Sequence, residues 1–69
     1  MKVMYYVIEI SNGVYFSSES NHGGYSQFEV TTQIDKANQF YSLLFAQEIM
    51  QKYTGKIKTL KIHYEVGDL

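Results

Sequence analysis

The sequence predicts a small α+β domain, in which a four-stranded antiparallel sheet in the order β-β-β-α-β carries one main helix on one face. Only residues 42–55 keep a helical period of apolar side chains. The stretches on either side alternate apolar with polar residues or are rich in β-branched and aromatic residues, as strands are. The 69 residues contain no proline, no repeat and no linker, so we expect residues 1–69 to form a single domain.

The main helix is expected to begin after Ser42 and to end at Gly55. The Ser42 hydroxyl can accept a hydrogen bond from a backbone N–H of the first turn, and a glycine suits the position that follows a helix. Leu44 falls in the middle of the polar arc and is expected to be exposed. The apolar arc, which should be buried, consists of Leu43, Phe45, Ala46, Ile49, Met50 and Tyr53.

The first strand and its hairpin are predicted from residues 3–16. Residues 3–10 are apolar on both faces, which is typical of an interior strand. An Asn-Gly dipeptide follows at 12–13 and supplies the two positive-φ positions of a tight hairpin turn. A two-residue loop places Glu9 opposite Phe16, so we expect Phe16 to share a face with Val7.

The remaining elements are predicted as follows. The serine- and glycine-rich residues 17–26 read as a connecting loop, and the alternating residues 27–32 as a half-exposed strand. The helical phase changes near Tyr41, so we expect a separate short helical turn over 34–40, capped by Asp35 and packed on the same side as the main helix. Residues 56–66 alternate again and form the last strand, next to the first.

One helix, about 10–12 Å wide, covers only part of one face of a sheet roughly 15–20 Å wide. The other face is expected to expose an aromatic and aliphatic patch flanked by Lys61 and His63, and such side chains are typical of protein interfaces. The favoured outward set is Val3, Tyr5, Val7 and Phe16, with Met4, Tyr6 and Ile8 plus Tyr15 as the alternative. We expect a homodimer through this face. The predicted partner-binding residues are Tyr5, Val7, Phe16, Tyr25, Leu44, Lys61 and His63.

Composition argues against several functional classes. The net charge is −1 and all six basic residues are lysines, so the arginine that reads phosphate and guanine is missing and a nucleic-acid partner is not expected. No stretch has the length or cleavage pattern of a membrane span or signal peptide, which favours a cytoplasmic protein. There is no cysteine, and the two histidines lack the spacing of a metal site or a catalytic group. We expect no enzymatic activity, no metal and no cofactor.

Two sets of short motifs carry a resemblance. One is Asp-Lys-Ala-x-x-Phe-x-Ser at 35–42, followed by Ala46 and Gly55. The other joins the apolar strand at 6–8 to the turn at 12–13 and to Val-Tyr-Phe at 14–16. Together they resemble short phage and prophage proteins of Gram-positive bacteria. The resemblance implies a helix packed on a small sheet, no catalytic residue, and a role in binding and blocking a host protein, including the defence nucleases of CRISPR systems.

Two functions from different classes follow. The first is a non-enzymatic protein-binding module, a phage-derived inhibitor or modulator of a host protein. The alternative is a small-ligand or nucleotide-binding protein with a site at a homodimer interface, formed by Tyr5, Phe16, Tyr25 and Lys61.

Overall fold

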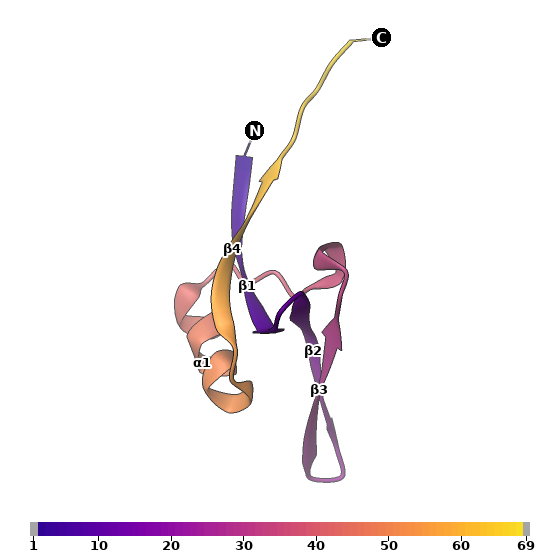
Figure 1. Ribbon diagram of the computed structural model, residues 1–69, viewed down its shortest axis with the longest axis vertical. Helices are drawn as coiled ribbons and strands as arrows, with labels where there is room; N and C mark the ends of the chain where they lie inside the picture. The colour runs from indigo at the N-terminus through magenta and orange to yellow at the C-terminus, as the bar shows by residue number, and fades with distance from the viewer. Residues whose placement is uncertain (1, 69) are drawn as a thin grey trace.

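The computed structural model describes residues 2–68, apart from the side chains of Lys2, Asn21, His22, Tyr25 and Ser26. It contains a four-stranded antiparallel sheet in the order β3-β2-β1-β4, one α-helix and one short 3-10 turn (Figure 1). This confirms the predicted α+β class, the interior position of the first strand and its pairing with the last. The elements are β1 (Lys2–Ser11), β2 (Val14–His22), β3 (Tyr25–Thr31), η1 (Ile34–Lys36), α1 (Leu43–Tyr53) and β4 (Lys56–His63).

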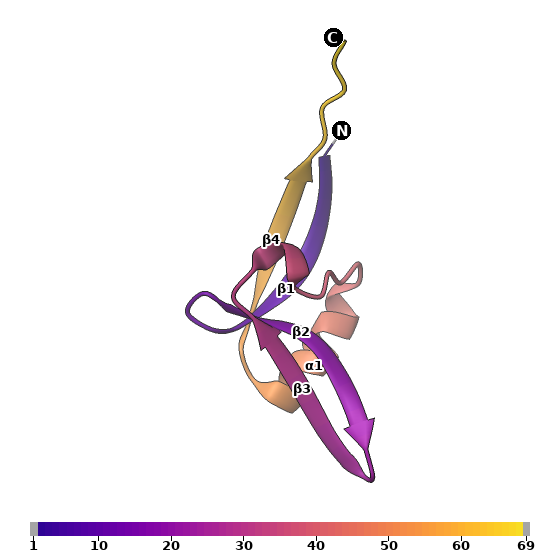
Figure 2. The same ribbon diagram turned by 90° about the vertical axis from the view of Figure 1, so that its right-hand side faces the viewer.

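The molecule is elongated, with principal extents of 52 × 22 × 22 Å. Its radius of gyration is 14.1 Å, whereas a compact domain of this length has about 11 Å. The sheet divides into a β1–β4 ribbon and a β2–β3 hairpin, which point to opposite ends of the molecule (Figures 1 and 2). The division follows from short pairing, since β2 pairs with β1 only near the turn, at Glu9↔Tyr15 and Ser11↔Val14.

The segment before α1 takes the place that β2 leaves beside β1. The Tyr6 N–H donates to the Phe40 carbonyl at 2.8 Å, and the Phe40 N–H donates back to Tyr6 at 2.8 Å. The Asn38 N–H donates to the carbonyl of Phe16 at 3.0 Å. These bonds tie residues 38–40 to both halves of the sheet and satisfy backbone groups that the divided sheet would leave open.

A β-bulge corrects the predicted register of the first hairpin. Glu9 pairs with Tyr15 rather than with Phe16, because the pairing shifts by one residue between Glu9 and Ser11. A shift of one residue turns every following side chain to the other face. Phe16 therefore lies on the face of Ile8, inside the core, and the prediction that it shares the outer face with Val7 is wrong.

The predicted loop over 17–26 is also wrong, because β2 and β3 pair along almost their whole length. Gly23 and Gly24 form the two-residue turn, with φ of 56° and 89°. Such positive values are those of the tight turns that join antiparallel strands, and glycine adopts them without steric cost. The serines around this turn thus belong to strands, although their composition is typical of loops.

The core lies between α1 and one face of the sheet. It consists of Ile8, Phe16, Phe40, Ala46 and Ile49, with Tyr6, Ile10, Met50, Tyr53 and Ile57 packed against it. Only the middle and the end of the predicted apolar arc of α1 reach this core. Leu43 and Phe45, in the first turn, are exposed.

The short turn η1 does not lie where the sequence predicted. Figure 1 shows α1 and η1 on opposite sides of β1, whereas the expectation placed both on one side. Val7, which points to the face opposite Ile8, is only 1% exposed, so that face is not open at this position. Asp35 does not cap this turn, because its N-cap residue is Gln33 and no side chain caps it.

The ends of α1 follow the prediction more closely. The Phe45 N–H donates to the Ser42 hydroxyl at 3.3 Å, so Ser42 is the N-cap. At the other end Thr54 and Gly55 have φ of 66° and 114°. A Cβ on Gly55 would lie 2.8 Å from the backbone oxygen of Glu9, so the chain needs glycine at this position. β4 ends at His63 rather than at the predicted Val66.

Candidate protein-binding surface

The structure does not bring the predicted partner-binding residues together. Val7 and Phe16 are each 1% exposed, so neither side chain is available to a partner, and the homodimer predicted through them lacks that surface. Phe16 is buried because the bulge in β1 turns it onto the face of Ile8, in the core. The side chain of Tyr25 lies outside the described part of the chain.

Tyr5 and Lys61 point to opposite faces of the β1–β4 ribbon. Residues directly opposite each other in a sheet share a face, and Tyr5 pairs with Leu60 while Lys61 pairs with Met4. Lys61 and His63 are therefore not beside Tyr5, and the ligand site proposed from Tyr5, Phe16, Tyr25 and Lys61 is not assembled within one chain. His63 instead lies beside Glu65, with Nε2 3.1 Å from Oε1.

A different group of large apolar side chains is exposed where α1 begins. Tyr41 is 80% exposed and Leu44 67% exposed. We call this group the helix-start patch, and it consists of Tyr41, Leu43, Leu44 and Phe45. Leu44 was predicted to be exposed, but the other three were missed. The signal for Tyr41 was available, since consecutive residues of an extended segment point in opposite directions and Phe40 points inward.

The backbone fixes the position of the helix-start patch. The paired hydrogen bonds between Tyr6 and Phe40 hold the chain immediately before it, and the Ser42 cap sets the first turn of α1 immediately after. Two ring contacts support the patch from below. The Tyr41 ring meets Tyr5 edge-on with centroids 5.0 Å apart, and the Phe45 ring lies 5.7 Å from that of Phe40. The exposed side chains thus stand on a rigid base.

Tyr5 and Tyr41 also interact through their hydroxyl groups. A hydrogen bond with Tyr41 raises the pKa of Tyr5 above its ordinary value of 10.0, and lost hydration and the neighbouring Tyr41 and Tyr64 act in the same direction. The bond favours the protonated, neutral form of Tyr5.

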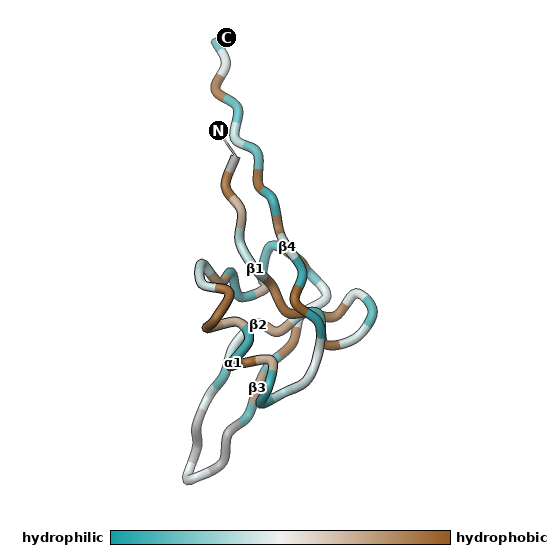
Figure 3. Tube along the Cα trace, turned by 90° about the vertical axis from the view of Figure 1, so that its left-hand side faces the viewer, coloured by the Kyte–Doolittle hydropathy of each residue, from teal (hydrophilic) through white to brown (hydrophobic). Residues whose placement is uncertain are grey.

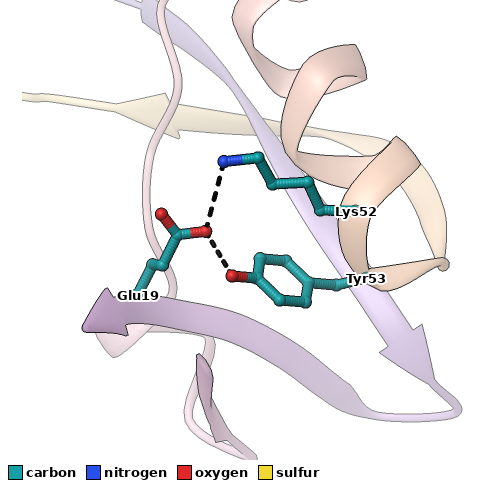
Figure 4. A network of polar contacts seen from close by, with 3 residues as sticks. All are labelled: Glu19, Lys52 and Tyr53. Carbon is teal, nitrogen blue, oxygen red and sulfur yellow. Dashed lines mark hydrogen bonds and ion pairs between the residues drawn. The ribbon is translucent and has the colours of Figure 1, made fainter. Parts of the chain in front are cut away.

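The most developed polar cluster lies at the other end of α1 (Figure 4). The Tyr53 hydroxyl donates to the carboxylate of Glu19, and Lys52 Nζ lies 3.7 Å from the same oxygen. Glu19 comes from β2 and both partners come from the last turn of α1. Beside this cluster the Phe16 ring stacks on those of Phe28 and Tyr53, and the rings of Phe28 and Tyr53 are tilted with centroids 4.6 Å apart. The cluster fastens the hairpin to the helix, which is a structural role.

Two hollows near Thr54 are open to solvent. One, of 410 Å³, is lined by residues 9–12 and 54–56, and the other, of 580 Å³, by Phe28 and residues 50–55. Among the described residues, no three histidine, aspartate or glutamate side chains come close enough together to hold a metal ion. Within the same part of the chain, no helix has both the length and the apolar character needed to cross a membrane.

Comparisons of the chain with family models, with curated proteins and with solved structures find no match.

Proposed function

We propose that this chain is a non-enzymatic protein-binding module that contacts its partner through the helix-start patch. One observation carries the proposal: four large apolar side chains are exposed within five consecutive residues, 41–45, on a rigid base. Solvent-exposed aromatic and leucine side chains gathered in one place are typical of interaction sites, whereas single exposed apolar residues need no explanation. Tyrosine and phenylalanine are also enriched at interfaces.

The partner we propose is a host protein, and the role is inhibition or modulation of that protein by a phage-derived chain. The resemblance of the motifs at 35–42 and 6–16 to short phage and prophage proteins supports this role, including action against a CRISPR nuclease or another defence protein. The absence of arginine argues against nucleic acid as the partner.

A comparative pull-down from host lysate tests the proposal. The wild type is compared with Tyr41→Ser/Leu44→Glu, which makes the helix-start patch polar while leaving the core unchanged, and with Gln27→Glu, which adds charge at an exposed position of β3. We expect one protein to be retained by the wild type and by Gln27→Glu and lost from the double variant. Equal recovery by all three, or enrichment of nucleic acid alone, would contradict the proposal.

A further inference from the structure

On its outer side β4 pairs with no other strand of the described chain, because β4 is the last strand of the sheet. The backbone bridge between Tyr6 and Phe40 shows which residues of β4 direct their N–H and carbonyl groups toward this outer edge. Tyr6 uses its N–H and carbonyl on the side away from β4, so the odd-numbered residues of β1 are the ones that bond β4. The pairs Val3↔Ile62 and Tyr5↔Leu60 then leave the odd-numbered residues of β4 facing outward. These residues are Ile57, Thr59, Lys61 and His63.

The strand β4 is basic, since it contains Lys56, Lys58 and Lys61. Lys58 Nζ lies 3.9 Å from Glu9 Oε1 of β1, so Lys61 is the lysine that bears on the outer edge near the end of the strand. The segment that follows it, residues 64–68, is acidic and lies outside any strand, with Glu65, Val66 and Asp68 exposed. The segment continues past the sheet in the direction of β4, away from α1 and from the hairpin (Figures 1 and 2). Hydrophobic and hydrophilic residues still alternate along it, as they do in a strand (Figure 3).

We propose that β4 and residues 64–67 pair with the same residues of a second copy, antiparallel, about a two-fold axis at His63. This register places Lys61 opposite Glu65 of the second copy. Two residues along, it places Thr59 opposite Gly67, and on the other face it places Leu60 opposite Val66. The outward backbone groups of Thr59, Lys61 and His63 are the ones that such pairing uses. Opposite charges and apolar side chains directly across two strands stabilise their pairing.

The occupant is a second copy because the basic strand and the acidic segment are collinear. Within one chain the acidic segment touches the edge of β4 only where the two join, with Glu65 Oε1 3.1 Å from His63 Nε2, and it continues away from Lys61 (Figure 1). A two-fold axis places the β4 edge of each copy against the acidic segment of the other copy, so the contact forms twice. The charges also select the register. With the axis at Lys61 instead of His63, the lysines of the two copies would lie opposite each other, which is unfavourable.

The proposed pairing does not involve the hairpin or the helix-start patch. The axis lies at the end of the ribbon remote from the hairpin (Figure 1), so the pairing would join the two sheets edge to edge and place the two hairpins at opposite ends of the joined sheet. Pairing also removes the open edge on which an isolated β4 would recruit other strands. The contact is separate from the helix-start patch, so a partner bound at the patch and a second copy at β4 involve different surfaces.

A charge-swap series tests the proposal, with self-association measured by sedimentation equilibrium from micromolar to millimolar protein. We expect the wild type to dimerise and Lys61→Glu and Glu65→Lys each to weaken the dimer roughly tenfold, because each creates two like-charge pairs. The combined variant should recover most of the wild-type affinity. A wild type that stays monomeric throughout, or a combined variant no tighter than either single one, would overturn the proposal.

A backbone variant tests the pairing independently of charge. Glu65→Pro removes an N–H that the proposed dimer uses but that lies outside the strands of the single chain, so the fold should persist by circular dichroism. Glu65→Ala is the matched control, because it removes the carboxylate and keeps the N–H. We expect the proline variant to be the weaker dimer of the two. Equal affinities would show that no main-chain pairing forms at this position and would overturn the register.

Discussion

The β2–β3 hairpin and the far end of the β1–β4 ribbon are both two-stranded and both project from the core, but they are held very differently. The hairpin is fastened to α1 by stacked rings around Phe16 and by the contacts of Glu19 with Tyr53 and Lys52. At the far end of the ribbon the Tyr5 ring meets Tyr41 edge-on, and the chain then continues into an exposed segment.

The difference reflects where α1 lies on the sheet. α1 has only 11 residues, and its last two turns carry the side chains that pack on the sheet and the hairpin. The apolar side chains of its first turn, Leu43, Leu44 and Phe45, are not covered and remain exposed. The hairpin is packed against α1, whereas side chains at the ribbon end and in the first turn of α1 remain exposed.

The largest expected effect comes from removing the ring at the centre of the hairpin's attachment. Phe16→Ala should cost roughly 3–5 kcal/mol, which is most of the stability of a domain of this size. Phe45→Ala, in the exposed first turn, is the matched control and should cost less than about 1 kcal/mol. Urea denaturation followed by circular dichroism measures both. Similar costs for the two variants would show that the attachment of the hairpin contributes no more to stability than the first turn of α1.

A smaller effect is expected where β4 starts and passes close to β1. Gly55→Ala should destabilise the fold by roughly 2 kcal/mol, because the added methyl group meets the Glu9 carbonyl and because φ is positive. At Gly67 a Cβ meets nothing within 4 Å, so Gly67→Ala should leave the melting temperature unchanged. A thermal melt of the two variants gives the comparison, and an unchanged melt for Gly55→Ala would mean that the ribbon is not pinned here.

The polar attachment of the hairpin should contribute less than the rings. Tyr53→Phe keeps the ring stack and removes the hydroxyl that donates to Glu19, so we expect a loss of roughly 1 kcal/mol. A double-mutant cycle with Glu19→Gln separates this bond from other effects of either change. Additive losses would show that the two side chains do not stabilise each other.

The smallest effect concerns the ribbon's own ring contact. The raised pKa of Tyr5 means that the folded state holds this proton more tightly than the unfolded state does. The stabilisation is therefore complete below pH 10.0 and is lost as the pH rises through the folded pKa. Ultraviolet titration of tyrosinate should show the pKa of Tyr5 returning toward its ordinary value in Tyr41→Phe, with a smaller change in Tyr64→Phe. Equal changes in the two variants would contradict a hydrogen bond to Tyr41.

The local elements were determined by the sequence alone, because each has a short-range physical cause. The helical period over 42–55, the Ser42 cap, the glycine after the helix and the two apolar faces of β1 all predicted what the structure shows. The topology followed from these elements, since a strand that is apolar on both faces needs neighbours on both sides. Leu44, the one exposed residue correctly placed in the helix-start patch, followed from the same helical period.

Pairing between distant residues decided the rest. A single bulge in β1 turns Phe16 from the predicted outer face into the core, and no local pattern in the sequence marks its position. The serine-rich hairpin forms because Gly23 and Gly24 allow a tight turn and because Phe28 finds Tyr53 on the distant helix. The exposure of Tyr41, Leu43 and Phe45 depends on where α1 lies on the sheet. Helical periodicity determines which side of a helix is apolar, whereas only the tertiary structure determines how much of that side is covered.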